Sequence, residues 1–309
     1  MEGSVRLLQN IPEIEPERWM KRIKLHSPNV TAFLSGKLGF LYEVGGTNGV
    51  EVRARKNIER LLPIHYSTKI ENKAQLQDKF QIIVAADGYR SNLANESGLF
   101  NSRTPKQIGV GVGFTVKGDF DPELIEIWLD NYFSLNGYSY AIPFSEHEAS
   151  LVSASIGKKI NQAAYRERLK ELAQLKNWEL ESAWVDFESW YDFSMYAKDN
   201  LYVVGNAGSF TEPAFGFGLK WAMQSAKLCA RAIDENGDYN NLIREALLPD
   251  FESYQLIKES FETTNDDSYD RLIKLFRNPL VKRLAESGTS IFQNKWLMSV
   301  LFPQVRRAK

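Results

Sequence analysis

The feature that most constrains this 309-residue chain is a strand, a glycine-rich loop and a helix in direct succession over residues 201–233. The run at 201–204 has the apolar content of a buried strand. Glycines follow at positions 205, 208, 216 and 218, and glycine lets a backbone approach a ligand closely. The helix expected at 219–233 points the N–H groups and positive dipole end of its first turn into the loop. This arrangement favours an anionic or electron-rich ligand, with a ligand-free turn as the alternative.

A second segment has related features. Residues 80–86 form an apolar run typical of a strand buried on both faces in a parallel sheet, and Asp87 and Gly88 follow it directly. Arg90 and Ser91 come next and can form hydrogen bonds. Because ligands of open α/β sheets bind at the carboxyl ends of the strands, we expect Asp87 and Asn206 to lie at neighbouring ends of one parallel sheet.

Other elements follow from hydrophobic periodicity and turn residues. A hairpin is expected from extended segments at 23–27 and 37–43, and an antiparallel meander from 108–116, 124–133, 138–144 and 149–156. Single strands are expected at 50–55 and 178–193. Helices are expected at 162–176, at 219–233 and throughout the region beyond 237, where 247–261 and 272–284 repeat apolar residues every three or four positions. The apolar face of the 219–233 helix is expected to consist of Leu219, Ala222, Met223, Ala226, Ala230 and Ile233.

Composition excludes several classes of protein. With 38 basic and 39 acidic residues, the formal net charge of −1 provides no field for nucleic acid. A lone cysteine, Cys229, rules out an internal disulfide and multi-cysteine metal sites, and three scattered histidines leave little for a metal site. We expect Cys229 to be a buried small hydrophobe. No apolar run is long enough to span a bilayer and the amino terminus lacks a signal-peptide pattern, so we expect a cytoplasmic protein.

The carboxyl-terminal segment combines an apolar stretch at 296–303 with Arg306, Arg307 and Lys309. Peripheral contact with an anionic membrane is one interpretation of this pattern. A helix that ends in cations is the other.

Three motifs together resemble the geranylgeranyl reductase family of FAD-dependent oxidoreductases, which have a flavin monooxygenase-type fold. They are AADGYRS at 85–91, the aromatic- and proline-ending strands of 109–114 and 124–144, and LYVVGNAGSFTEPAFGFGLKWAMQSA at 201–226. The resemblance covers most of residues 20–235. It implies an α/β (α+β) fold with an FAD/NAD(P)-binding-type sheet, an antiparallel substrate-domain sheet and a carboxyl-terminal helical region. The implied domains are a nucleotide-binding-type part at 1–100 and 200–238, a substrate domain at 101–199 and a helical region at 239–309.

The resemblance also assigns site residues, although Asn206 replaces the usual aspartate and brings no charge. The residues expected to contact FAD are Asp87, Gly88, Gly205, Asn206, Ala207, Gly208, Pro213, Gly216 and Gly218. The residues expected to line the substrate pocket are Tyr138, Tyr140, Pro143 and Phe144.

The implied activity is reduction of carbon–carbon double bonds in a polyprenyl or other hydrophobic lipid substrate, with hydride from flavin N5. No protein proton donor can be named. The alternatives are a flavin monooxygenase or halogenase-like enzyme, or a non-catalytic relative that binds a hydrophobic ligand without FAD.

One departure from the family concerns FAD directly. No GxGxxG fingerprint precedes residue 20, and the glycines of 109–113 do not supply one because the required third glycine is Phe114. The chain is therefore expected to be an amino-terminally incomplete copy or a relative that has lost FAD binding. In either case we expect weak FAD affinity and a sheet with an unpaired edge or a rearranged neighbour.

Overall fold

A computed structural model describes residues 17–42, 47, 49–99, 106–135, 137–156, 161–191, 195–261 and 264–287, without the side chains of 106–110, 156 and 184–191. The chain divides into two compact units. The large-sheet unit comprises the described residues within 1–53, 110–187 and 256–309, and the glycine-loop unit comprises those within 54–109 and 188–255. The carboxyl-terminal segment 296–309 lies outside the described residues, so its predicted membrane contact stays a prediction.

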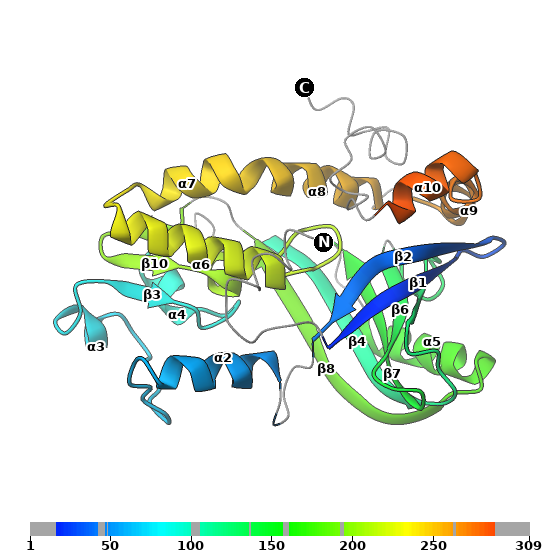
Figure 1. Cartoon of the computed structure of the whole chain (residues 1–309), viewed down its shortest axis with the longest axis horizontal. Coiled ribbons are helices and arrows are strands. Elements are labelled where there is room, and N and C mark those ends of the chain that lie inside the picture. Colours follow the sequence, from blue (N-terminus) through cyan, green and yellow to red (C-terminus); the bar gives the residue numbers. More distant parts are fainter. Residues whose placement is uncertain are drawn as a thin grey trace. The chain divides into compact units, whose positions relative to one another are not determined.

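The main sheet has seven strands in the order β2-β1-β5-β6-β7-β4-β8. Their bounds are β1 Arg18–His26, β2 Thr31–Leu41, β4 Lys106–Lys117, β5 Leu124–Trp128, β6 Gly137–Pro143, β7 Glu148–Ile156 and β8 Glu179–Tyr191. The predicted hairpin is confirmed by the antiparallel β1–β2 pair (Figure 1). The predicted meander is confirmed for its last three strands, by the antiparallel β5–β6 and β6–β7 pairs, but its first strand, β4, lies next to β7 and not next to β5. The expected β8 strand is also present.

The pairing of β1 with β5 in this sheet was also not predicted. Strand β1 runs parallel to β5, from Arg22 opposite Leu124 to His26 opposite Trp128, and so joins the hairpin to the meander. Turn residues specify hairpins between neighbouring segments, whereas a pairing across about a hundred residues depends on the complete fold.

Helix α5, Gln162–Leu175, covers part of the large sheet and has the predicted extent. The Asn161 side chain caps its first turn by accepting a hydrogen bond from the Ala164 N–H. The helix contacts β7. Its buried residues Tyr165, Leu169, Leu172 and Ala173 pack in one core with Val112, Phe114, Trp128 and Leu151 of the sheet.

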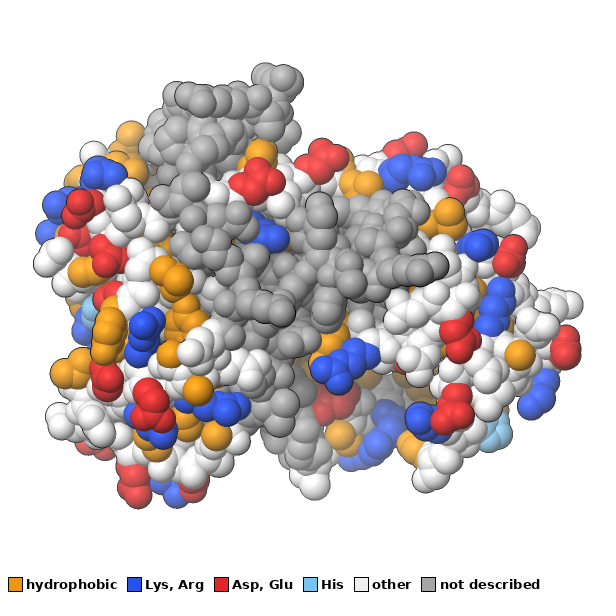
Figure 2. All heavy atoms as spheres, turned by 180° about the vertical axis from the view of Figure 1, so that it is seen from behind, with side chains coloured by type: hydrophobic (Ala, Val, Ile, Leu, Met, Phe, Trp, Pro, Cys, Tyr) orange, Lys and Arg blue, Asp and Glu red, His pale blue; other side chains and the backbone are white. Residues whose placement is uncertain are grey.

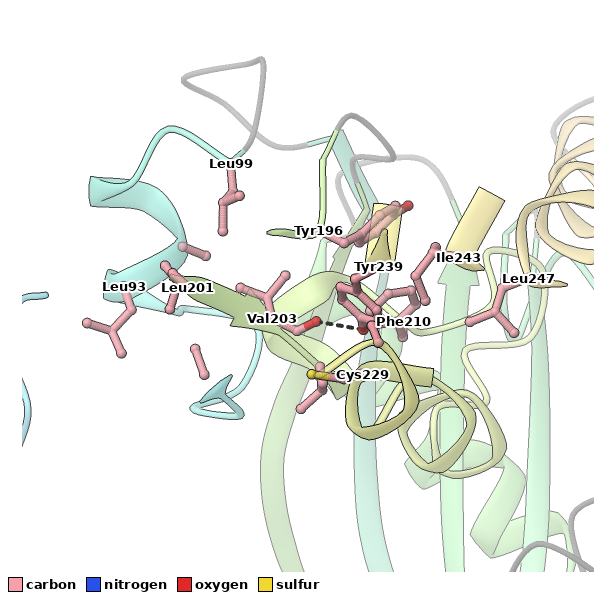
Figure 3. Packing of buried hydrophobic residues seen from close by; sticks show 14 of the residues in the cluster. Leu93, Leu99, Tyr196, Leu201, Val203, Phe210, Cys229, Tyr239, Ile243 and Leu247 are labelled. Atoms are coloured by element: carbon pink, nitrogen blue, oxygen red, sulfur yellow. Dashed lines mark hydrogen bonds between the residues drawn. The ribbon is translucent and has the colours of Figure 1, made fainter. Parts of the chain in front are cut away.

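The glycine-loop unit is built on a small sheet in the order β3-β10-β9, with β3 Ile83–Ala85, β10 Leu201–Val203 and β9 Ala197–Lys198. Strand β3 is shorter and less buried than the predicted 80–86 strand, because Phe80, Ile82 and Val84 are all exposed. Among the described residues β3 lies at the edge of its sheet. The expected unpaired edge or rearranged neighbour in place of a missing strand stays a prediction. The core behind the sheet includes Leu93, Tyr196, Val203, Phe210, Cys229 and Tyr239 (Figure 3).

Two sequence predictions in this region were wrong. Residues 50–55 form the start of helix α2, Val50–Glu59, because alternation over six residues is too short to outweigh the helix-forming residues that follow.

Helix α6, Leu219–Asp234, has the predicted extent, but its buried face differs from the predicted one. The buried face consists of Trp221, Ser225, Cys229 and Ala232, while Ala226 and Ala230 are exposed. Alanine drives burial weakly, and Trp221 determines which face packs. The predicted burial of Cys229 is confirmed.

The residues described beyond 237, up to 287, are mostly helical, as predicted: α7 Tyr239–Ala246, α8 Leu248–Phe261, α9 Asp266–Leu275 and α10 Pro279–Glu286. The repeat at 272–284 is divided between α9 and α10, because Asn278 and Pro279 begin a new helix. Among the described residues, no helix has the length and apolar character needed to cross a bilayer. Basic and acidic side chains are interspersed on the face seen in Figure 2, as the nearly balanced composition predicts.

Candidate cofactor site in the glycine-loop unit

The two segments singled out in the sequence end at the same edge of one sheet. Strands β3 and β10 pair in parallel, with Tyr202 opposite Val84 and Val203 opposite Ala85. The Val204 N–H continues the ladder by donating to the Ala85 carbonyl at 3.0 Å. The prediction of a parallel pair with Asp87 and Asn206 at its carboxyl ends is confirmed.

The turn after β3 leaves open space at the edge of the sheet. Gly88 has a φ of 84°, which favours glycine, and among the described residues no heavy atom outside its chain neighbours lies within 4 Å of where a Cβ would be. The Ser91 hydroxyl, in contrast, accepts from the Ala94 N–H and caps helix α4, Asn92–Glu96. Ser91 therefore has a structural role, whereas the contact of Gly88 with FAD stays a prediction.

The first half of the glycine loop is packed against its own unit. Residues Gly205–Gly208 form a 3-10 turn, and the Gly205 N–H donates to Ser225 Oγ at 3.0 Å. A Cβ at Gly208 would lie 2.5 Å from the Phe210 ring. Ala207 is buried as well. The observed contacts of Gly205, Ala207 and Gly208 are with residues of their own unit. The sequence prediction that these residues contact FAD stays a prediction.

Asn206, at the position where the resemblance implies an aspartate, is exposed. Its Oδ1 accepts a hydrogen bond from Thr211 Oγ1 at 2.7 Å. A Cβ on Gly218 would lie 3.3 Å from each of these oxygens, so glycine there lets the end of the loop pass close to the pair. The amide oxygen therefore retains acceptor capacity but already has one partner.

Glu212 is the residue that sequence reasoning missed. Its side chain is 1% exposed and accepts three backbone hydrogen bonds. Oε2 accepts from the Ala214 N–H at 2.8 Å, and Oε1 accepts from the Phe215 and Phe217 N–H groups at 2.8 and 3.2 Å. Burial raises the pKa of Glu212 to about 7, against the opposing effect of these hydrogen bonds. The sequence signal that could have indicated this buried acid is its position in a turn of otherwise small and aromatic residues.

The second half of the loop exposes backbone next to the α6 helix. Pro213 is buried, whereas Gly216 is exposed and has a φ of 74°. Gly218 is the N-cap of α6, and among the described residues no side-chain hydrogen bond caps this end. The first turn therefore presents backbone N–H donors and the positive end of the dipole. Lys220 in the same turn lies 4.2 Å from the centroid of the Trp221 ring, and burial lowers its pKa.

The open position at Gly88, the exposed Gly216 and the uncapped α6 terminus fit an electron-rich planar group with hydroxyls, such as the flavin end of FAD. The residues that the structure describes contain no group of three or more His, Cys, Asp or Glu placed to bind a metal ion.

The residues predicted to line the substrate pocket lie on or beside β6 of the large-sheet unit. Tyr138 and Pro143 are buried, and the Tyr138 and Tyr140 rings stack with centroids 5.8 Å apart. Burial raises the pKa of Tyr140 to about 12. Phe144 is 53% exposed, next to a strand end that the Arg18 guanidinium fixes through the Pro143 and Phe144 carbonyls. Their role toward a substrate stays a prediction.

Comparison with solved structures identifies the class of fold. A geranylgeranyl bacteriochlorophyll reductase-like protein from Thermoplasma acidophilum superposes with a TM-score of 0.71 at 17% identity, covering 97% of this chain and 85% of that protein. The flavin-dependent halogenase CmlS superposes with a TM-score of 0.58 at 14% identity, covering 99% and 68%. The chain has the α/β fold of the FAD-dependent oxidoreductases, as predicted.

Sequence comparison narrows the class. Digeranylgeranylglycerophospholipid reductase 2 from Methanothermobacter thermautotrophicus is 27% identical over 158 residues, which are 50% of this chain and 40% of that protein. The reductase of the same name from Methanosarcina acetivorans is 23% identical over 334 aligned positions, covering 92% and 80%. No protein-family model matches. The chain is thus a relative of the geranylgeranyl reductases, which confirms the predicted resemblance. Its matched region spans about half of the two M. thermautotrophicus reductases, 40% and 54%.

Proposed function

We propose that this chain is a flavin-dependent oxidoreductase that reduces carbon–carbon double bonds in a polyprenyl or other hydrophobic isoprenoid lipid. The observation that carries the proposal is the parallel pairing of β3 with β10, which brings the Asp87–Gly88 turn and the glycine loop to one sheet edge. The sequence relatives are named as reductases of digeranylgeranyl lipids, which supports an isoprenoid substrate class.

FAD is the cofactor that this fold and these relatives imply. The residues that would hold its flavin end are Asp87, Gly88, Asn206, Gly216 and Gly218. When bound, FAD supplies a hydride from N5 for the reduction. The uncapped first turn of α6 would stabilise negative charge on the reduced ring, and the Asn206 amide oxygen would accept a hydrogen bond from a ribityl hydroxyl.

The substrate side of the proposal rests on β6. Tyr138, Tyr140, Pro143 and Phe144 combine aromatic and apolar surface, which suits a hydrocarbon chain without charged groups. Tyr138 is buried and Tyr140 is half-buried, and their stacked rings restrict each other's rotamers, so that a hydrocarbon chain reaching this strand would meet aromatic side chains of fixed conformation.

The test has two steps. First, the purified chain is titrated with FAD and its absorption spectrum is recorded, because a bound flavin changes its absorption bands. Second, the chain, excess FAD and a polyprenyl glycerolipid are incubated anaerobically with dithionite as the electron source, and the lipid is analysed by mass spectrometry. A mass gain of two hydrogen atoms for each reduced double bond supports the proposal. Unchanged lipid in the presence of demonstrably bound, reduced flavin contradicts it.

A further inference from the structure

Glu212 forms hydrogen bonds throughout the turn that it begins. Besides the three bonds to its carboxyl group, its own N–H donates to the Phe217 carbonyl and its carbonyl accepts from the Gly216 N–H, each at 3.2 Å. The turn 212–217 belongs to no helix or strand. Its conformation is therefore maintained largely by one side chain.

We propose that Glu212 is a positioning residue, whose carboxyl group fixes the backbone of 213–217 so that Gly216, Gly218 and the first turn of α6 keep the arrangement that receives a ligand. The inference rests on the proposed function only in taking that ligand to be the flavin. The hydrogen bonds by which Glu212 holds the turn do not depend on which ligand binds.

An acid fits this role better than any other side chain of its size. Both oxygens of a carboxyl group accept hydrogen bonds, so Oε1 and Oε2 together satisfy three converging N–H donors. In Glu212→Gln, the amide nitrogen would face the Ala214 N–H, which places two donors against each other. Buried N–H groups without acceptors are unfavourable, so the turn would open more often.

The surroundings explain how the turn responds to pH. Tyr254 of α8 packs against the turn, because its ring contacts that of Phe215 edge-on. Burial and the charge of Glu212 raise the pKa of Tyr254. The charge of Asp250 on α8 acts on both Tyr254 and Lys220 of α6: it adds to the effect of burial on the pKa of Tyr254 and opposes the effect of burial, which lowers the pKa of Lys220. Because the closed turn holds the pKa of Glu212 above its ordinary value, proton binding favours closure. The closed conformation of the turn 212–217 should therefore become less stable as the pH rises to about 7, and its stability should change little above that pH.

The experiment is hydrogen–deuterium exchange of the full chain without flavin, read by mass spectrometry on peptides that cover 213–217. Exchange in Glu212→Gln is expected to be about tenfold faster in this turn than in the natural chain, while the Ile243 region of α7 keeps its protection. The matched control is Asp270→Asn, because Asp270 is another buried carboxylate that accepts a backbone N–H, that of Asn29 in the large-sheet unit. This control should leave the turn unchanged. Equal exchange in Glu212→Gln and the natural chain would overturn the proposal.

A pH series on the natural chain needs no variant and so does not depend on how well a variant folds. After correction for the intrinsic exchange rate, protection of the turn should decrease from pH 5 to about 7, and this trend should be absent in Glu212→Gln. Constant protection of the natural chain across this range would also contradict the role. FAD, added at a concentration at which its absorption spectrum shows it to be bound, separates the two proposals. If bound FAD leaves the turn's exchange unaltered but the variant and pH effects are present, the positioning role stands and the flavin function fails.

Discussion

The amide oxygen of Asn206 accepts a hydrogen bond from the Thr211 hydroxyl at 2.7 Å, and both groups lie against Gly218 at the start of α6. The resemblance to the geranylgeranyl reductase family implies an aspartate at this position. The exchange of acid for amide therefore removes a charge from the point where the loop meets the positive end of a helix dipole.

Restoring this acid should strengthen FAD binding. In Asn206→Asp, the Thr211 hydroxyl can still donate, and a second carboxylate oxygen becomes free for a ribityl hydroxyl. A charge-assisted hydrogen bond exceeds a neutral one by about 1 kcal/mol, so the dissociation constant should fall roughly fivefold. Fluorescence titration of the natural chain, Asn206→Asp and Asn206→Ala gives the ranking. Tighter binding by the alanine variant would show that position 206 does not face the cofactor.

Gly205 is needed for the conformation of the loop. Its φ is 56°, and a Cβ would lie 3.4 Å from the Cβ of Ala222 on α6. Gly205→Ala should therefore lower the free energy of unfolding of the glycine-loop unit by about 1–2 kcal/mol. Gly237→Ala is the control, because the nearest neighbour of its Cβ would be the Ala232 Cα at 3.8 Å and its φ is not left-handed. Urea denaturation should shift the midpoint of the first variant and leave that of the second nearly unchanged.

The core of the same unit contains a polar contact that can be tested separately. The buried Tyr239 hydroxyl lies 3.0 Å from the Val203 carbonyl (Figure 3). It also lies 3.2 Å from the Ser225 carbonyl. Tyr239→Phe removes the donor and should cost about 1–2 kcal/mol of unfolding free energy. Tyr132→Phe serves as the comparison, since its hydroxyl bonds Glu171 on the exposed surface. Equal effects of the two variants in thermal denaturation would argue against a stabilising role of the buried contact.

Local sequence patterns predicted much of this architecture. The strand, loop and helix at 201–233 follow from an apolar run, glycines and helical periodicity, all properties of neighbouring residues. The parallel pair of β3 and β10 was predicted as well, because carboxyl ends of parallel strands meet at one edge. Patterns of this kind suffice where each element's sequence agrees with its final environment.

The sequence predictions were wrong or incomplete where contacts with distant residues determine the local structure. The buried face of α6 turns toward Ser225, which accepts a hydrogen bond from the Gly205 N–H, and this cannot be read from the helix alone. The parallel β1–β5 pairing depends on distant segments for the same reason. Glu212 was missed because an acid in a loop is ordinarily solvated, and only the folded turn brings three N–H donors onto its carboxyl group.

The large-sheet unit has its own pH-dependent contact. Glu126 Oε2 lies 2.7 Å from His26 Nε2 and 2.6 Å from Lys176 Nζ. Burial raises the pKa of Glu126, but the hydrogen bonds and the nearby charges outweigh it and lower the value to about 2. This pKa is below that of an unfolded glutamate, so the stabilisation is complete above about pH 4.5 and is lost as the pH falls toward 2.

Glu126→Gln should remove this pH dependence. When the pH falls from 5 to 2, the variant should lose roughly 3 kcal/mol less unfolding free energy than the natural chain. Denaturant curves at several pH values measure it. Glu167→Gln is a suitable control, because Glu167 pairs with Lys170 on an exposed helix surface. Parallel acid profiles for the natural chain and Glu126→Gln would contradict the assigned role of the cluster.

The last prediction concerns how tightly the 309-residue chain itself binds FAD. The loops at the β3–β10 edge suit the flavin end, but no GxGxxG fingerprint precedes residue 20 to supply N–H donors to the pyrophosphate. Each charge-assisted hydrogen bond contributes roughly 1.5–3 kcal/mol, so losing several weakens affinity by orders of magnitude.

The expected result is a dissociation constant for FAD well above micromolar, and similar weak binding of FMN and riboflavin, because the flavin end provides most of the contacts. Titration of the purified chain with each compound, followed by flavin fluorescence, measures this. Saturable FAD binding at submicromolar concentration, much tighter than FMN binding, would instead show that other residues of this chain hold the adenosine and pyrophosphate.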